Sequence, residues 1–464
     1  MQTNATTALK ADQLGALSSA AWAGLGTNEI AALSTTQVAG LGAISIAGLD
    51  ATRFSALKTE QLQALSAGAI AAVKGSQIAS LSSAQVSKLT VSEIQGLSAS
   101  AVSGLTTANV AAMTTTQTQA ISAAAIGSID ADALAALVTG QAGLLNISQI
   151  SQISAKQIDK VLAVNVFDAS EMRHVSSSAM KGITAATMGT LDSKNFTVSQ
   201  MAQLSSSQVA GLGATNIDAL NGDQLAALST SAWGGLTTAD VFAIKEAELG
   251  MLGANFGKGL QKTQVAGLST HQMQSLSSNT IAAFNGTLVG AFNSKQVMAL
   301  TETEIGYLSA SAVSGLGSAQ VAALTTSQVK AISASSFGSI NAASLSVSQT
   351  KALTTAQVGR LSGAQVDQVI SALTTAQQMG IALNAVAGIA DSKIASLNLG
   401  GLSGAQIGRL DRDDVIALST TQINAMSTQQ ISGFTRAQLA YLNAAQWGEI
   451  GNATGTGDRV SKTA

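Results

Sequence analysis

A repeat of eight residues constrains the fold of this chain more than any other feature of its sequence. In the segment "LSTTQVAGLGAISIAGL", Leu33, Leu41 and Leu49 lie eight residues apart. Val38 and Ile46 each lie three residues before the next leucine. The spacing continues through most of the chain and gives the consensus [ST]-x-x-Q-[VI]-x-x-L. Short regular repeats are typical of solenoids, in which each unit packs against its neighbours.

Each unit carries the start signal of a helix. Ser34 is followed three residues later by Gln37, which is the spacing of a capping box. Leu33 precedes the cap and Val38 follows it, as in a hydrophobic staple. Val38 and Leu41 are three residues apart and share one helix face. The unit therefore predicts a short helix followed by a stop.

The acidic residues fit the same positions of the unit. Carboxylates are favoured at the N-cap and in the first helical turn. The octad places these residues at the N-cap or at N3, the third helical position: Asp50, Asp130, Asp192 and Asp411 at the cap, and Glu29, Glu93, Glu248, Glu304 and Asp414 at N3. We therefore interpret most charges as helix caps.

A β-solenoid is the competing fold, but it requires apolar and polar residues to alternate within each unit. Here the two apolar positions are three apart, and Ala, Gln, Leu and Met are frequent. One octad cannot fold alone, because burial of its two apolar side chains contributes about 3–6 kcal/mol and ordering each backbone residue costs about 1–2 kcal/mol. We predict an all-α solenoid, or superhelix, with one short helix per repeat. Leu and Val/Ile rows face inward, and Ser, Thr, Gln, Ala and Gly face outward.

The octads themselves repeat at a distance of 211 residues. "KADQLGALSSAAWAGL" (10–25) matches "NGDQLAALSTSAWGGL" (221–236), and Trp22 pairs with Trp233. A third start is indicated by "RAQLAYLNAAQWGEI" (436–450). The predicted organisation is one solenoid copy at 1–211, a second at 212–425, the start of a third at 426–450, and a polar tail at 451–464.

Some units depart from the spacing of eight. Five-residue units stand at 192–196, 341–345 and 398–402, and 130–134 is the expected counterpart of 341–345. The segment 162–183 breaks the octad most strongly. We expect bends or ledges in the coil at these places.

The composition excludes several classes of function. Charged residues are 10% of the chain and the net charge is −2, which gives no electrostatic footprint for nucleic acid or for an anionic membrane. The absence of Cys excludes disulfides and thiolate metal sites. No run of 18 apolar residues predicts a transmembrane helix. The first residues, "MQTNATTALKADQ", lack the pattern of a cleaved signal peptide.

The sequence contains few residues in patterns typical of catalytic or metal-binding sites. His174 lies near Asp168 and Glu171, which is a weak signal for a metal site, and His271 occupies a variable position of an ordinary octad. "GANFGKG" (253–259) is Gly-rich without a P-loop or dinucleotide pattern. We predict no catalytic, cofactor-binding or metal-ligating residue, no cofactor, and no enzymatic activity.

Several units resemble a known class of repeat. "LTTAQV" (353–358), "LTTSQV" (324–329) and "LSTTQV" (33–38) are similar to the Leu-Thr-Thr-Ala-Gln-Val octapeptide arrays of large proteobacterial surface and secreted proteins, often labelled adhesin-like or haem-utilisation proteins. The resemblance covers most of the chain. It implies a bacterial protein at the cell surface or outside the cell, exported by type I secretion with an uncleaved C-terminal signal. The chain lacks the GGxGxDxUx calcium nonapeptide, so calcium-driven folding is not implied.

We therefore expect an extracellular or cell-surface structural protein that self-assembles into a fibre, sheath or layer. A surface with few charges lacks the repulsion that keeps proteins monomeric. The duplicated copies present similar surfaces, so head-to-tail contacts can propagate. The expected partner is a second copy of the chain, with cell-surface polysaccharide as a second partner, and neither nucleic acid nor membrane insertion is expected. The alternatives are the spacer or stalk of an adhesin, a solenoid that binds carbohydrate or peptide and, more remotely, ice binding.

Overall fold

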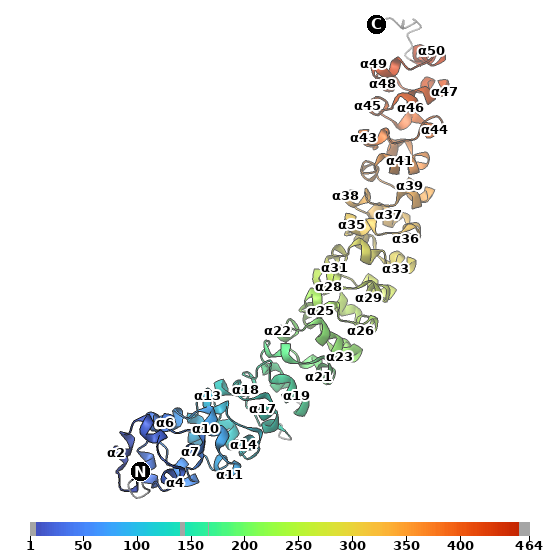
Figure 1. Ribbon diagram of the computed structural model, residues 1–464. Helices are drawn as coiled ribbons and strands as arrows, with labels where there is room; N and C mark the ends of the chain where they lie inside the picture. Colours follow the sequence, from blue (N-terminus) through green and yellow to red (C-terminus); the bar gives the residue numbers. More distant parts are fainter. Residues whose placement is uncertain (1–5, 140–143, 166, 454–464) are drawn as a thin grey trace. The chain divides into compact units, whose positions relative to one another are not determined.

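In the computed structural model, residues 6–139, 144–165 and 167–453 are described, and every regular element in these ranges is a short helix (Figure 1). The all-α prediction is therefore confirmed. The chain divides into two compact units, Met1–Gly235 and Leu236–Ala464. In each unit, successive helices wind into a coil, and helices three positions apart in the chain commonly pack together, as α3 and α6 or α32 and α35 do.

The helices of the first unit, with 3₁₀ helices marked η, have these bounds: α2 (Ala11–Gly15), α3 (Ser19–Ala23), α4 (Thr27–Ala31), α5 (Thr35–Ala39), α6 (Ala43–Gly48), α7 (Ala51–Ser55), α8 (Thr59–Leu62), α9 (Ala67–Ala71), α10 (Gly75–Ser80), α11 (Ser83–Val86), α12 (Val91–Gly96), α13 (Ala99–Val102), α14 (Thr107–Ala111), α15 (Thr115–Ala120), α16 (Ala123–Ile126), α17 (Ala131–Val138), α18 (Ile147–Ile150), α19 (Ile158–Val164), α20 (Ala169–His174), η1 (Ala179–Gly182), α21 (Ala185–Met188), η2 (Ser193–Asn195), α22 (Val198–Met201), α23 (Ser206–Ala219), α24 (Gly222–Ala226) and α25 (Thr230–Trp233).

The helices of the second unit have these bounds: α26 (Thr238–Phe242), α27 (Glu246–Leu249), α28 (Ala254–Gly259), α29 (Lys262–Ala266), α30 (Thr270–Gln274), α31 (Ser278–Ala282), α32 (Gly286–Val289), α33 (Ser294–Ala299), α34 (Glu302–Gly306), α35 (Ala310–Ser314), α36 (Ser318–Ala323), α37 (Thr326–Ala331), α38 (Ala334–Phe337), η3 (Ala342–Ser344), α39 (Val347–Lys351), α40 (Thr355–Val358), α41 (Gly363–Val369), η4 (Ile370–Ala372), α42 (Thr375–Gln378), α43 (Leu383–Val386), α44 (Asp391–Ile394), η5 (Leu399–Gly401), α45 (Gly404–Ile407), α46 (Arg412–Ala417), α47 (Thr420–Asn424), α48 (Thr428–Ile431), α49 (Arg436–Leu439) and α50 (Ala444–Ala453).

The capping box forms as the sequence predicts, and α5 shows its geometry. The Gln37 backbone N–H donates to Ser34 Oγ at 3.2 Å, and the Ser34 N–H donates to Gln37 Oε1 at 2.8 Å. Ser34 itself has an extended backbone, with ψ at 157°. Each octad is therefore a helix of one to two turns joined to the next by an extended cap residue.

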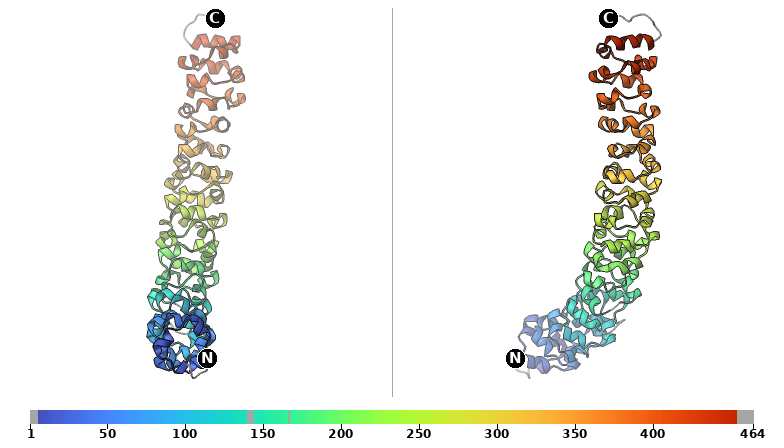
Figure 2. Two further views of the ribbon diagram at one scale, coloured as in Figure 1. Left: turned by 60° about the vertical axis from the view of Figure 1, so that its left-hand side comes forward. Right: turned by 90° about the vertical axis from the view of Figure 1, so that its right-hand side faces the viewer.

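The apolar rows of the octad form the core of each coil. Val38 and Leu41 are buried, and so are Leu97 and Leu308 at matching positions of the two sequence copies. Trp22 and Trp233 are also buried, and they occupy matching positions of the two sequence copies, although both lie in the first compact unit. The left view of Figure 2 shows the N-terminal helices of the first unit, drawn in blue, arranged as a ring.

Glycine pairs allow neighbouring turns to approach closely. A Cβ on Gly104 would lie 1.9 Å from the Gly75 carbonyl oxygen, and a Cβ on Gly315 would lie 2.1 Å from the Gly286 carbonyl oxygen. Gly75 and Gly286 are 211 residues apart, as are Gly104 and Gly315, so the duplicated sequence keeps the contact in both units. Any larger residue at these positions would have to push the turns apart.

The five-residue units change the type of helix. The units at 192–196, 341–345 and 398–402 contain η2, η3 and η5, which are all 3₁₀ helices. A 3₁₀ helix rises more per residue than an α-helix, so a shorter unit can span one step of the coil. The segment 130–134 differs from its expected counterpart 341–345, because it begins α17, an eight-residue α-helix.

Candidate functional site

The glutamine of the consensus joins each turn of the coil to the preceding one, and Gln77 shows how. Its Oε1 accepts a hydrogen bond from the Lys74 N–H at 2.8 Å. Its Nε2 donates to the carbonyl oxygens of Ile46 and Leu49, both at 2.8 Å. The side chain is 0% exposed. One amide group therefore caps its own helix and binds two backbone carbonyls of the neighbouring turn.

The same pattern recurs along both units and forms what we call the glutamine ladder. Its members donate from Nε2 to carbonyls 28 and 31 residues earlier, as these residues do: Gln117, Gln149, Gln157, Gln296, Gln320, Gln328 and Gln438. The expectation that Gln faces outward is therefore wrong for this position. Only the capping role could be predicted from the sequence, because the repeat spacing does not determine which turns of the coil pack against each other.

Acidic residues at the same position cannot complete the ladder. Glu29 Oε2 accepts from the Gly26 N–H at 2.7 Å, and Glu93 Oε2 accepts from the Thr90 N–H at 2.5 Å. The other oxygen of each carboxylate, Oε1, is buried without a hydrogen-bond partner. A carboxylate has no N–H to offer. At a third such position, burial raises the pKa of Glu304 above its usual value.

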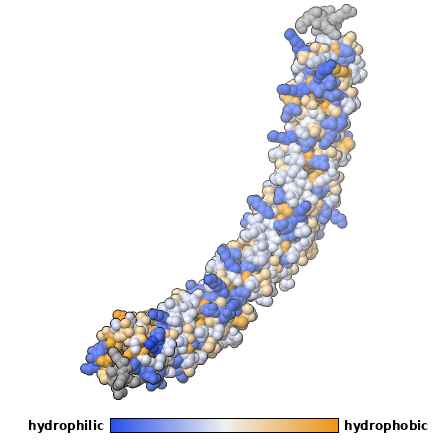
Figure 3. Space-filling model, in the orientation of Figure 1, coloured by the Kyte–Doolittle hydropathy of each residue, from blue (hydrophilic) through white to orange (hydrophobic). Residues whose placement is uncertain are grey.

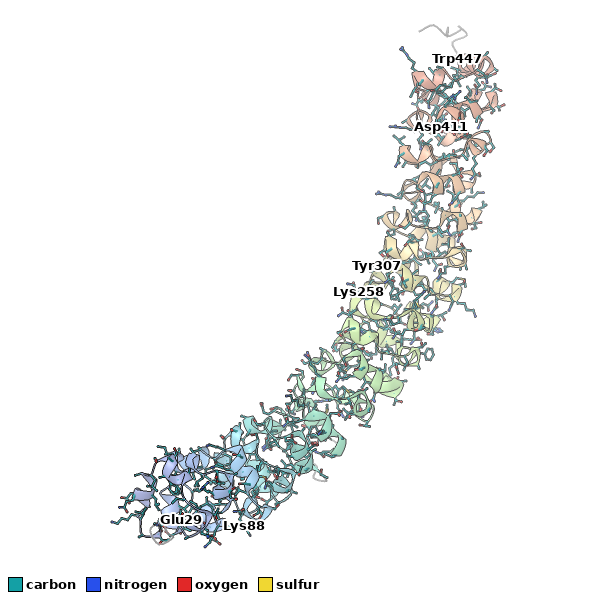
Figure 4. All side chains as sticks on the ribbon, viewed as in Figure 1. Glu29, Lys88, Lys258, Tyr307, Asp411 and Trp447 are labelled. Carbon is teal, nitrogen blue, oxygen red and sulfur yellow. The ribbon has the colours of Figure 1, made fainter. Side chains whose placement is uncertain are left out.

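A cluster of three aspartates lies between α44 and α46. One carboxylate oxygen from each of Asp391, Asp411 and Asp414 lies within 4.8 Å of the others. Asp411 accepts from the N–H groups of Asp413 and Asp414 at 2.9 Å, so its predicted cap position is confirmed. Sequence reasoning missed the approach of Asp391, which comes from the preceding turn. Figure 4 labels Asp411 in the second unit.

Asp414 is the buried member of this cluster. Its Oδ2 accepts from the Asp411 N–H at 3.1 Å, and its Oδ1 is buried without a partner. Burial is the main cause that raises the pKa of Asp414 to about 6, with repulsion from Asp411, Asp391 and Asp413 adding to the shift. The three carboxylates therefore form a concentrated negative site that includes a desolvated oxygen.

The structure does not assemble a site around the histidines. His174 is exposed and its Nδ1 lies 2.7 Å from the Ser170 carbonyl oxygen, within α20. The carboxylates of Asp168 and Glu171 cap that helix by accepting from each other's backbone N–H groups. His271 is exposed on α30. Across residues 6–139, 144–165 and 167–453, the aspartate cluster is the one group of three side chains spaced to hold a metal ion.

The surface mixes polar, neutral and apolar side chains without a broad uniform patch on the face seen in Figure 3. The exposed apolar residues include Phe242, Tyr307 and Tyr441. A hollow of about 830 Å³ in the first unit is lined mainly by polar and small residues, including Gln95, Gln119, Asn146, Asp168, Ser170 and Glu171. Within the described residues, the helices are too short to span a bilayer.

Comparison with known families identifies the repeat. A family model described as the ALTTAQ repeat matches residues 6–43 and 407–444. The first match covers α2 to α5, and the second covers α46 to α49. No curated protein matches the chain. The ALTTAQ repeat is therefore present near both ends of this sequence.

Proposed function

We propose that this chain is a non-enzymatic, extracellular or cell-surface structural protein that self-assembles end to end into a fibre, sheath or layer. The proposal includes the adhesin-like, type I-secreted context that the octapeptide resemblance implies. The expected partner is a second copy of the chain.

The glutamine ladder is the observation that carries the proposal. Each turn uses backbone carbonyls to accept from the following turn and amide groups to donate to the preceding one, so a turn is complementary to another copy of itself. Gln37 donates to the carbonyl of Leu9 at 2.7 Å. Gln13, one coil turn earlier, is exposed, and its Oε1 caps α2.

The low charge of the chain supports the same proposal. Only 10% of residues are charged and the net charge is −2. Two copies that approach each other therefore meet little long-range repulsion. The contacts that follow are hydrogen bonds and apolar contacts of the kind that already join the turns.

Electron microscopy of the purified chain tests the proposal. We expect fibres or sheets at modest salt. Aspartates introduced together at Ala440 and Ala444, which are both exposed near the last turns, should suppress them, because the added charges would repel an incoming copy. The matched control is Thr107→Asp, an exposed position in the first unit, which should leave assembly unchanged. Dispersed wild-type particles, or equal effects of the two changes, would contradict the proposal.

A second candidate function is favoured by the hollow of about 830 Å³ in the first unit. Its amide, hydroxyl and carboxylate groups could bind the hydroxyls of a polysaccharide. Glycan-array binding that is lost in Gln119→Ala, without any assembly of the wild-type chain, would favour this function over the structural one. The spacer function instead predicts a monomer that binds no glycan.

A further inference from the structure

We propose that Asp391, Asp411 and Asp414 form a binding site for a divalent cation of the calcium class. Their ligand oxygens all lie within 4.8 Å of one another. Calcium binds oxygens at about 2.4 Å, so oxygens on opposite sides of the ion are about 4.8 Å apart. One ion can therefore contact all three carboxylates. The proposal is independent of the assembly proposed above.

The buried carboxylate of Asp414 is the second observation that points to a cation. Its side chain is 0% exposed, and its Oδ1 has no hydrogen-bond partner. Exposed carboxylates gather on many surfaces without binding an ion. A desolvated carboxylate oxygen with no donor is costly, and a bound cation removes that cost.

The neighbouring ladder units indicate what the Asp414 carboxylate faces. Gln406 donates to carbonyls 28 and 25 residues earlier, at 3.0 and 2.7 Å. Gln422 uses the same two offsets, at 2.6 and 2.7 Å. The same register at position 414 places the carbonyls of Val386 and Ile389 opposite the carboxylate.

An oxygen that faces other oxygens needs a positive partner. Aspartate lacks the N–H groups of glutamine and is one methylene shorter, so it leaves space between the turns where the amide would lie. Asp391 begins α44, two residues after Ile389, and adds a carboxylate at the same edge. The result is a set of carboxylate and carbonyl oxygens, which are the ligands that calcium prefers.

The nearby basic side chains have other partners. Lys393 Nζ lies 3.2 Å from Asp367 Oδ2. The guanidinium carbon of Arg412 lies 5.8 Å from the centre of the Tyr441 ring. Asp391 and Asp411 are exposed, so a solvated ion can reach the site. Magnesium fits less well, because its oxygen ligands lie at about 2.1 Å in a strict octahedron.

A proton is the competing partner of Asp414, because a protonated carboxyl could donate to one carbonyl. Asp414→Gln distinguishes the bound proton from the bound cation. Glutamine supplies the N–H donors of the glutamine ladder and removes the carboxylate that would bind calcium. We expect this variant to melt at a higher temperature than the wild type in excess chelator, and to lose calcium binding. A variant that binds calcium as the wild type does would overturn the site.

Isothermal titration calorimetry of the chelator-treated full chain with CaCl₂ at pH 7.5 tests the proposal directly. We expect one saturable site per chain, an affinity at least tenfold weaker for MgCl₂, and a rise in melting temperature with calcium. Asp391→Asn and Asp411→Asn should each weaken binding at least tenfold. Asn at position 411 keeps the oxygen that caps α46, so the helix remains.

Two controls remove one negative charge outside the ligand set. Asp413→Asn changes an aspartate on the same helix that is not one of the three ligands. Glu93→Gln changes a carboxylate that, like that of Asp414, has a buried oxygen without a hydrogen-bond partner, but Glu93 does not belong to the aspartate cluster. Both should bind calcium within about threefold of the wild type. No saturable binding by the wild type, equal affinity for magnesium, or an equal loss in Asp413→Asn and Asp411→Asn would overturn the proposal.

Discussion

At the scale of the residue, the consensus glutamine has an NH₂ group where glutamate has a second carboxylate oxygen. The coil uses both the oxygen and the NH₂ group of this amide. In α10, Gln77 accepts a helix-capping bond through Oε1 and donates two bonds to the preceding turn through Nε2. Most serine and threonine caps bond within their own unit, although Ser66 and Ser277 also donate to a carbonyl of the preceding turn. The glutamine is therefore the residue that couples one turn to the next.

Replacing Gln77 with alanine should lower the free energy of unfolding by about 1–3 kcal/mol, because three backbone groups lose a hydrogen bond and two of these bonds are buried. Gln95 is an exposed glutamine on α12 and provides the matched control. Its replacement with alanine should change stability by less than about 0.5 kcal/mol. Chemical denaturation of both variants measures the difference, and equal values would show that the ladder does not hold the turns together.

Glu304 should make stability depend on pH. Burial raises the pKa of its carboxyl, so the charged form is less favourable in the folded chain than in the unfolded one. The folded state therefore binds the proton more tightly, and stability at this site falls as the pH rises through the raised pKa. Glu304→Gln removes the charge and supplies a ladder donor. It should raise the free energy of unfolding by about 1 kcal/mol at pH 7.

The pH series checks the sign of this effect. The advantage of Glu304→Gln over the wild type should shrink as the pH falls from the raised pKa to the usual pKa of glutamate, and should level off below it, where folded and unfolded carboxyls are both protonated. Glu302→Gln, at an exposed position of the same helix, should show no such advantage. A Glu304→Gln gain that grows in acid would contradict the account.

At the scale of the element, the octad is a short helix whose two apolar residues point into the coil. Leu308 is buried and Thr107 is exposed, as the sequence pattern predicts. The short helices are far below the length that is stable alone. Their stability therefore comes from the rows of side chains and the ladder, and not from the helix itself.

Leu308→Asp should lower the free energy of unfolding by more than about 3 kcal/mol, because it places an unpaired charge in the core. The matched change Thr107→Asp should shift stability by less than about 0.5 kcal/mol. Differential scanning calorimetry of both variants tests the assignment of inside and outside. Similar melting temperatures for the two variants would contradict this assignment.

The glycine contacts between elements should be equally sensitive to substitution. A Cβ at Gly315 would lie 2.1 Å from the Gly286 carbonyl oxygen, so Gly315→Ala should cost about 1–3 kcal/mol as the turns move apart. Gly68 lies within α9 with open space around its Cβ position. Gly68→Ala should be neutral or stabilising, since alanine favours the helix. Thermal melts that rank the two variants in the opposite order would contradict the packing.

Much of the fold could be predicted from the sequence, because Ser34, Gln37 and Val38 are local signals that recur in many units. The cap positions of Asp50 and Asp411 followed from the same spacing and are confirmed. Contacts between turns could not be predicted, because the number of octads per turn depends on packing. The partners of Gln77 and the approach of Asp391 to Asp414 therefore emerged only from the structure.

At the scale of the whole molecule, the proposed assembly extends the interactions that already join the turns. Each turn is bound by groups that recur in both units, and the two sequence copies keep equivalent contacts such as Gly75–Gly104 and Gly286–Gly315. An interaction surface that occurs twice in one chain can bind the next chain at the equivalent place. Open head-to-tail contacts of this kind give filaments.

Sedimentation velocity of the full chain over a wide range of concentrations tests this central claim most directly. End-to-end assembly predicts that the weight-average sedimentation coefficient rises steadily with protein concentration, and that the increase is lost when Ala440 and Ala444 are both changed to aspartate. A single, concentration-independent species with the mass of one chain would contradict self-assembly.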